Sequence, residues 1–229
     1  MKNKIIFYII VIISIIISFI YIKYHYEKII INNNKLTQVS KTEESTRRKI
    51  KIYYPITKHK KLNNEIKKDI NNYYNDFIKL TKNYNISRDM YYTFYVLYDE
   101  YYYKDYISIV LYIEQFLGGA HPDHFIHTIN YNTINNEIIN ISNLIDINNN
   151  LLTELSVKSL EKLKENPKFQ NKYDKQKLIE GTSPTIDNYK NFALTNKGLN
   201  IYFEYYQIAP YYYGYSEVTI PYNEINLML

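Results

Sequence analysis

Residues 107–131 contain the pattern that most constrains the fold of this chain. Apolar residues alternate with more polar ones at its start, which predicts a strand with one buried face. They are Ile107, Ile109, Leu111 and Ile113. A Gly-Gly pair at 118–119 interrupts the alternation, and these are two of only five glycines in the chain. Since glycine adopts backbone conformations that other residues resist, and Pro122 fixes φ just beyond, we expect a sharp bend. A second strand is predicted over residues 125–131.

Other segments supply the partners of this bent unit. Alternating patterns predict strands over residues 50–54, 90–103, 138–141, 201–205 and 217–222. Apolar residues three and four apart predict helices over residues 62–80, 151–163 and 174–180, the last ended by Gly181. Asp99-Glu100 and Lys104-Asp105 bracket the expected hairpin connection into the strand at 107. Strands and helices interleave without strict βαβ alternation, which favours an α+β fold with antiparallel sheets and packed helices.

The N-terminus carries a membrane-anchor pattern. Residues 5–22 are apolar except for two serines, and eighteen helical residues span about 27 Å, close to the thickness of a bilayer core. Lys2 and Lys4 precede the run and favour a cytoplasmic N-terminus. The run ends in bulky side chains instead of a small-residue cleavage site, so residues 1–22 are predicted to be a retained signal anchor, with a cleaved signal as the alternative. Residues 23–48 are polar and are predicted to be a stalk.

Composition excludes several classes of function. The chain has no cysteine, so disulfides, thiol catalysis and Cys-ligated zinc are excluded. Its net charge is +5, but the lysines are spread along the chain, and a nucleic-acid partner is not predicted. The anchor and the absence of cysteine together predict a single-pass protein of the cell membrane whose C-terminal domain is extracellular.

The densest polar cluster lies in the bend. It consists of His121, Asp123, His124 and His127. Imidazole and carboxylate groups bind zinc and transfer protons, so a metal site or a metal-dependent hydrolase is one hypothesis. On a strand, however, His124 and His127 point to opposite faces. The other interpretation is a bend whose imidazoles form hydrogen bonds to the backbone or face water, and it predicts neither a metal nor another cofactor.

A tyrosine-rich loop is the second candidate site. Tyr211, Tyr212 and Tyr213 follow a proline in a chain with 29 tyrosines. Exposed tyrosines suit binding to sugars or proteins, because the ring stacks and the hydroxyl group forms hydrogen bonds. These three residues and His121 are the predicted ligand-binding residues. No serine-nucleophile elbow or glycine-rich phosphate loop occurs, so an enzyme is not predicted.

The chain resembles a known bacterial family through several blocks of sequence. They are Gly118-Gly-Ala-His-Pro122, Thr128-Ile-Asn-Tyr131, the segment 192–203, Tyr206-Gln-Ile-Ala-Pro-Tyr211, Gly214 and Val218-Thr-Ile-Pro-Tyr222. Their order resembles an extracytoplasmic domain shared by the anti-sigma factor RsiV and the N-terminal region of the peptidoglycan deacetylase PdaC. Tyr212 and Tyr213 stand where that family usually has small residues.

The resemblance implies two subdomains, over residues 49–117 and 118–229. It also implies a ligand at the cell wall, because RsiV-like proteins bind lysozyme and PdaC-like proteins act on peptidoglycan. We do not expect the sigma-binding segment of the first group or the deacetylase domain of the second in this chain. We therefore expect a non-catalytic, membrane-anchored binding module whose partner is a lysozyme-like protein or peptidoglycan.

Overall fold

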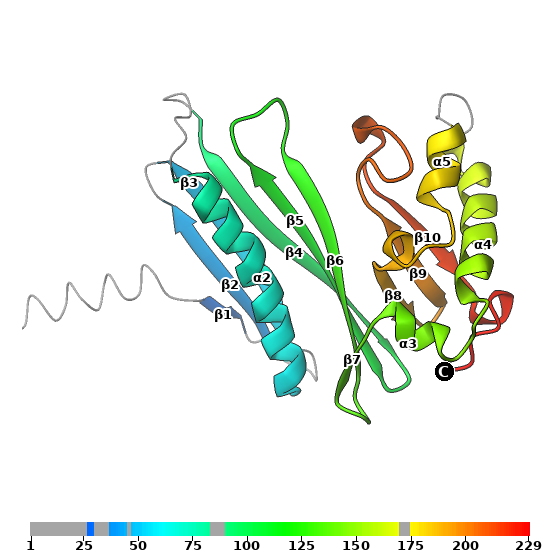
Figure 1. The fold of residues 1–229 in the computed structure, drawn as a ribbon. Helices are drawn as coiled ribbons and strands as arrows, with labels where there is room; N and C mark the ends of the chain where they lie inside the picture. Colours follow the sequence, from blue (N-terminus) through cyan, green and yellow to red (C-terminus); the bar gives the residue numbers. More distant parts are fainter. Residues whose placement is uncertain (1–26, 30–36, 45–46, 83–89, 170–174) are drawn as a thin grey trace, which may run out of the picture.

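The computed structural model describes residues 27–29, 37–44, 47–82, 90–169 and 175–229 (Figure 1). The predicted membrane anchor at residues 1–22 lies outside these ranges. Within them, no helix combines the length and the apolar character that crossing a bilayer requires.

A seven-stranded sheet forms the first unit, and its strands lie side by side in sequence order. Every neighbouring pair is antiparallel except β3 and β4, which are parallel. The helix α2 (Lys60–Leu80) makes the crossover that a parallel pair requires. The strands are β1 (Glu27–Ile29), β2 (Thr37–Glu44), β3 (Arg48–Ile56), β4 (Tyr92–Tyr103), β5 (Tyr106–Phe116), β6 (Asp123–Asn132) and β7 (Glu137–Ile139).

Helix α2 covers one face of this sheet (Figure 1). Its buried residues recur at spacings of four and seven, which places them on one stripe of the helix. They are Leu62, Ile66, Ile70 and Phe77. These side chains join Phe94 of β4 and Ile109 of β5 in one apolar core.

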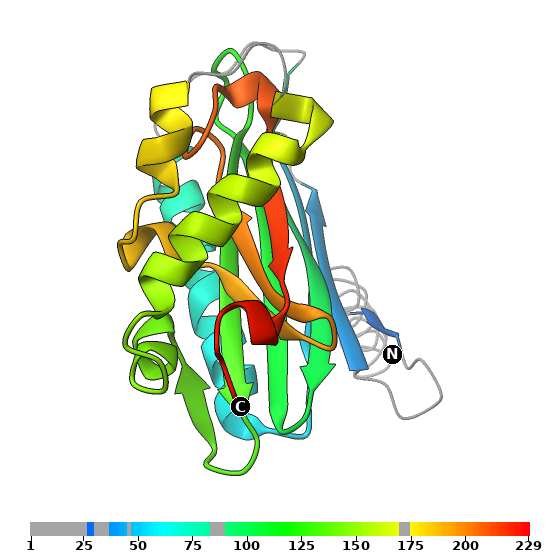
Figure 2. The same ribbon diagram turned by 90° about the vertical axis from the view of Figure 1, so that its right-hand side faces the viewer.

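A second unit follows β7 and contains a small antiparallel sheet in the order β10-β9-β8. In Figure 2, helix α4 runs diagonally across this sheet. All residues of β8 and β9 are buried, because the small sheet lies between α4 and the large sheet. The elements are α3 (Ile141–Ile145), α4 (Leu151–Glu165), η1 (Pro167–Phe169), α5 (Lys175–Gly181), η2 (Asp187–Tyr189), β8 (Phe192–Thr195), β9 (Gly198–Phe203), η3 (Tyr211–Tyr213), β10 (Ser216–Ile220) and η4 (Tyr222–Glu224).

The two units meet on the face of the large sheet opposite α2. Successive residues of β5 point to opposite faces, so Val110 faces the small sheet while Ile109 faces α2. Val110 packs there with Ile126 of β6, Ala193 of β8 and Tyr202 of β9. These four buried side chains form an apolar cluster between the two units.

A buried polar junction lies beside this cluster. The Ser108 hydroxyl donates to Oδ1 of Asn130 at 2.6 Å and accepts from the Leu194 N–H at 2.9 Å. Nδ2 of Asn130 donates to the Phe192 carbonyl at 2.9 Å. Because a paired polar group is stable in an apolar interior and an unpaired one is costly, this junction fixes the position of β8 on the large sheet.

The structure corrects two predicted boundaries. The Gly-Gly bend is the turn of the β5–β6 hairpin, and β6 and β7 extend the seven-stranded sheet. The boundary predicted between residues 117 and 118 is therefore wrong, and the core of the second unit begins at Ile141. Residues 37–44, predicted to be stalk, form strand β2 and pair with β3 over eight positions. Strand pairing uses backbone hydrogen bonds, so β2 forms without an apolar side-chain face.

The predicted α+β class with antiparallel sheets is confirmed, with the β3–β4 pair as the parallel exception. The bend is also confirmed, since Gly118 has a φ of 84°. Residues 99–103 lie within β4, however, and Lys104 (φ 49°) and Asp105 make the turn alone. Gly181 does end α5, but its role is close packing, because a Cβ there would collide with the Gln207 carbonyl.

We expect Asn130→Ala to destabilise the protein strongly. The substitution removes the hydrogen bonds that Asn130 makes with the Phe192 carbonyl and the Ser108 hydroxyl in a buried site. It also opens a cavity. The free energy of unfolding, measured by urea denaturation, should fall by about 2–4 kcal/mol. Asn149→Ala, at an exposed asparagine, should change it by less than about 0.5 kcal/mol. Equal effects of the two substitutions would contradict the proposed role of the junction.

Candidate functional site

The two strand histidines of the predicted cluster lie on opposite faces of the large sheet. His127 faces α2, where its Nε2 lies 2.8 Å from Oδ2 of Asp69. His124 faces the second unit, and its ring stacks on Tyr205 with the ring centroids 4.5 Å apart. The cluster suggested as an alternative metal site therefore does not assemble around one point. Among the residues that the structure describes, no three His, Cys, Asp or Glu side chains are grouped to hold a metal ion.

His121 and Tyr211, both predicted ligand-binding residues, lie together although they are 90 residues apart. Their rings stack with centroids 3.9 Å apart and an interplanar angle of 22°. The Tyr211 hydroxyl donates to the Pro122 carbonyl at 3.0 Å, and the Tyr206 hydroxyl lies 3.3 Å from Nε2 of His121. The end of the β5–β6 hairpin is thus joined to the loop between β9 and β10.

Tyr212 and Tyr213, the other two predicted ligand-binding residues, lie elsewhere. The Tyr213 ring stacks on Phe169 at 5.5 Å and packs against the core of the second unit. Tyr212 contacts Tyr213 and is 71% exposed. Of the three consecutive tyrosines, only Tyr211 joins the histidines.

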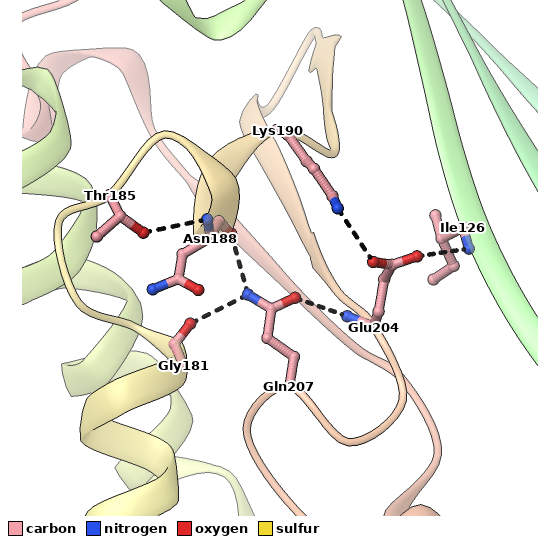
Figure 3. Close-up of polar contacts among 7 residues, drawn as sticks. All are labelled: Ile126, Gly181, Thr185, Asn188, Lys190, Glu204 and Gln207. Carbon is pink, nitrogen blue, oxygen red and sulfur yellow. Dashed lines mark hydrogen bonds and ion pairs between the residues drawn. The ribbon is translucent and has the colours of Figure 1, made fainter.

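Gln207 and Glu204 hold the loop that carries these tyrosines (Figure 3). Oε1 of Gln207 accepts from the Glu204 N–H at 3.0 Å. Nε2 of Gln207 donates to the carbonyls of Gly181 and Asn188, at 3.0 and 3.1 Å. The side chain therefore ties the loop to α5 and η2. Gly181 permits this close approach because it has no Cβ.

Glu204 also connects this loop to the large sheet. Its Oε1 accepts from the Ile126 N–H on β6 at 3.3 Å, and its Oε2 lies 3.7 Å from Nζ of Lys190 (Figure 3). The loop is thereby held against β6 at Ile126, two residues from His124.

Two adjoining hollows lie between the hairpin end and this loop. A hollow of about 240 Å³ is lined by Asp123, His124, Phe125, Glu204, Tyr205, Tyr206 and Tyr211. A second hollow, of about 170 Å³, shares three of these residues and reaches the floor of the large sheet. Its lining comprises Tyr95, Leu97, Tyr112, Ile113, Glu114, His124, Phe125, Ile126, Tyr205 and Tyr215. We call the two hollows together the aromatic recess.

The aromatic recess has the chemistry of a binding site. Burial and the neighbouring Tyr211 raise the pKa of Tyr205, and burial and Tyr206 raise the pKa of Tyr211. Both tyrosines therefore stay neutral at physiological pH, and the Tyr211 hydroxyl keeps the hydrogen that it donates to the Pro122 carbonyl. Nδ1 of His124 lies 3.7 Å from Oε2 of Glu114, a separation too long for a direct hydrogen bond. Ring faces with hydroxyl, imidazole and carboxylate groups can stack on a ligand and hydrogen-bond to its edges.

Sequence reasoning predicted Asp123, His124 and Tyr211 and missed the rest of the lining of the aromatic recess, including four residues of the second unit. They are Glu204, Tyr205, Tyr206 and Tyr215. Three of them follow directly after the end of β9, a position where side chains of a loop often form sites. The sequence signals for these three are that position and, for Tyr206, its place in a block shared with the known family. Their partners, Ile126, His124 and His121, are about 80 residues away in the chain.

Comparisons with known proteins match the two units of the chain to two different family models. Residues 39–124 match the family model of deacetylase PdaC, and residues 142–223 match that of a protein family of unknown function, DUF3298. Peptidoglycan-N-acetylmuramic acid deacetylase PdaC of Bacillus subtilis is 27% identical over 173 residues. That match covers 74% of this chain and 36% of the enzyme. The predicted resemblance to a PdaC-type extracytoplasmic domain is confirmed, and the likeness to RsiV stays a prediction.

Solved structures of DUF3298 proteins share the fold. One from Pseudomonas aeruginosa aligns with a TM-score of 0.56 and 17% identity, covering 89% of this chain and 93% of the other. One from Bacteroides fragilis aligns with a TM-score of 0.53 and 19% identity, covering 90% and 93%. At these identities the likeness concerns the fold alone.

Gln207→Ala should loosen the loop without unfolding the second unit. The substitution removes three hydrogen bonds, and we expect the free energy of unfolding to fall by about 1–3 kcal/mol. Amide hydrogen exchange over residues 204–211 should become faster. Gln176→Ala, which removes an exposed hydrogen bond on α5, should leave both readouts nearly unchanged. Unaltered exchange in Gln207→Ala would show that other contacts position the loop.

Proposed function

We propose that this PdaC- and DUF3298-type chain is a non-catalytic binding module of the bacterial cell envelope, and that its aromatic recess binds the glycan of peptidoglycan. The module is attached to the cell membrane through residues 1–22 and presents its folded part outside the cell.

The observation that carries the proposal is the pairing of stacked rings at the recess. His121 lies on Tyr211 and His124 lies on Tyr205, so four rings from both units meet at one surface. Sugar rings present C–H groups on their faces and hydroxyls on their edges. Aromatic ring faces pack against the C–H groups of a sugar. The tyrosine hydroxyls and the carboxylates of Asp123 and Glu204 can form hydrogen bonds with the sugar hydroxyls.

The comparison with PdaC supports peptidoglycan as the ligand. By its name, that enzyme acts on the N-acetylmuramic acid of peptidoglycan. This chain matches only 36% of its length, so the shared segment supports a common location and ligand and not a shared reaction.

A lysozyme-like protein is the second candidate partner, and it rests on the sequence resemblance. The overall charge of +5 works against long-range attraction to a basic protein. The glycan is therefore the preferred ligand.

Removal of the Tyr211 ring should weaken the binding of purified, insoluble peptidoglycan sacculi. We expect the full chain, solubilised in a mild detergent, to bind sacculi saturably at moderate salt. Tyr211→Ala should weaken this binding about tenfold, since one stacked aromatic contact contributes about 1–1.5 kcal/mol. Tyr102→Ala, at a half-exposed tyrosine outside the recess, should bind as the parent does.

Lysozyme binding is measured in parallel with the same samples. Saturable lysozyme binding without sacculus binding would contradict the glycan proposal and favour a sensor or decoy. Sacculus binding that Tyr102→Ala and Tyr211→Ala reduce equally would place the site elsewhere.

A further inference from the structure

The aromatic recess continues as a groove along the open face of the large sheet. A third hollow, of about 730 Å³, is lined by Tyr53, Leu97, Tyr98, Asp99, Glu100, Tyr112 and Tyr215. It shares Leu97, Tyr112 and Tyr215 with the recess, so the three hollows form one groove.

The groove exists because the small sheet covers only part of the large one. Tyr95, Leu97 and Asp99 alternate along β4 and face away from α2. Leu97 is 58% exposed on this face. From Tyr95 to Asp99 the floor runs about 13 Å along the strand, which is longer than one sugar ring. Tyr215, just before β10, and Tyr205 form the wall.

The lining of the groove is acidic although the chain as a whole is basic. Among the described lining residues, leaving out Glu100, which alternation places on the α2 face of β4, there are four carboxylates and no lysine or arginine. From outside the lining, Nζ of Lys190 pairs with Glu204 at 3.7 Å, and Nζ of Lys51 lies 6.0 Å from the centre of the Tyr95 ring. The whole chain carries 28 basic and 23 acidic residues. The four carboxylates are Asp99, Glu114, Asp123 and Glu204.

Two further observations agree with a cationic ligand. Glu114 and Asp123 contribute, after burial and Tyr206, to raising the pKa of Tyr211, and this reports a negative potential at the recess. On the same face of the sheet, Nζ of Lys49 lies 3.9 Å from the centre of the Tyr91 ring, so tyrosine faces here already accept an ammonium group.

We propose that the groove binds a stretch of several amino sugars whose nitrogens are free amines, that is, a de-N-acetylated glycan strand. This rests on the proposed function and specifies its ligand. Each ammonium group can approach a carboxylate of the lining while its sugar ring packs on a tyrosine. An N-acetylated sugar has the same ring but a neutral amide, so it lacks the electrostatic attraction to the carboxylates.

The test compares two soluble probes of equal length, a hexamer of glucosamine and the same hexamer fully N-acetylated. Binding to the full chain in detergent is measured by calorimetry at about pH 6, where the amines are charged. We expect the glucosamine hexamer to bind about tenfold more tightly, and this advantage to shrink with added salt.

Variants that replace a carboxylate by its neutral amide test which residues cause the preference for the amine form. Asp99→Asn and Glu114→Gln keep the shape of the side chain, and each should reduce the advantage of the amine form by at least about threefold. Asp187→Asn, at an exposed carboxylate of η2, should behave as the parent.

Each outcome separates this proposal from the function it rests on. Equal binding of both hexamers would overturn the amine preference and leave glycan binding standing. An amine preference that Asp187→Asn reduces as much as Asp99→Asn would overturn the groove as its source. Binding of neither hexamer, together with no binding to sacculi, would overturn the proposed function itself.

Discussion

The rest of the structure depends on the buried contact of Ser108 and Asn130 with strand β8. Apolar packing of Val110, Ile126 and Tyr202 drives the two sheets together, but such packing tolerates sliding. The three hydrogen bonds at the junction are directional and shielded from water, so they select one position of the small sheet. The groove follows from that position, since its floor belongs to one unit and its wall to the other.

The large sheet uses its two faces differently. Toward α2 it presents a continuous apolar core, and toward the second unit it is covered only in part. Residues on the uncovered part must be compatible with water and with occasional burial. Tyrosine meets both conditions because its ring is apolar and its hydroxyl is polar, which accounts for Tyr95 and Tyr112 on the floor of the groove.

Sequence periodicity was sufficient to predict local secondary structure. It was not sufficient to predict which segments far apart in the chain contact one another. The stripe on α2, the alternation in β5 and the bend at Gly118 were predictable because each depends on neighbours in the chain. The opposite orientation of His124 and His127 followed from strand geometry alone. Strand β2 pairs with the next strand, β3, but lacks an alternating apolar sequence. The positions of Glu204 and Tyr205 depend on contacts with β6, about 80 residues away, which no local pattern encodes. Tyr211 was a predicted residue, but only the fold separates it from Tyr212 and Tyr213.

The contrast between a basic chain and an acidic groove shows how net charge bears on recognition here. At physiological ionic strength exposed charges are screened beyond about 8 Å. A ligand inside the groove therefore responds to the few carboxylates that line it and much less to lysines on α2 or α4. In the proposed function, the overall charge of +5 acts on the approach of large partners, whereas Asp99 and Glu114 act on a ligand inside the groove. A chain of this kind can remain attracted to an anionic wall while its groove selects positively charged sugars within it.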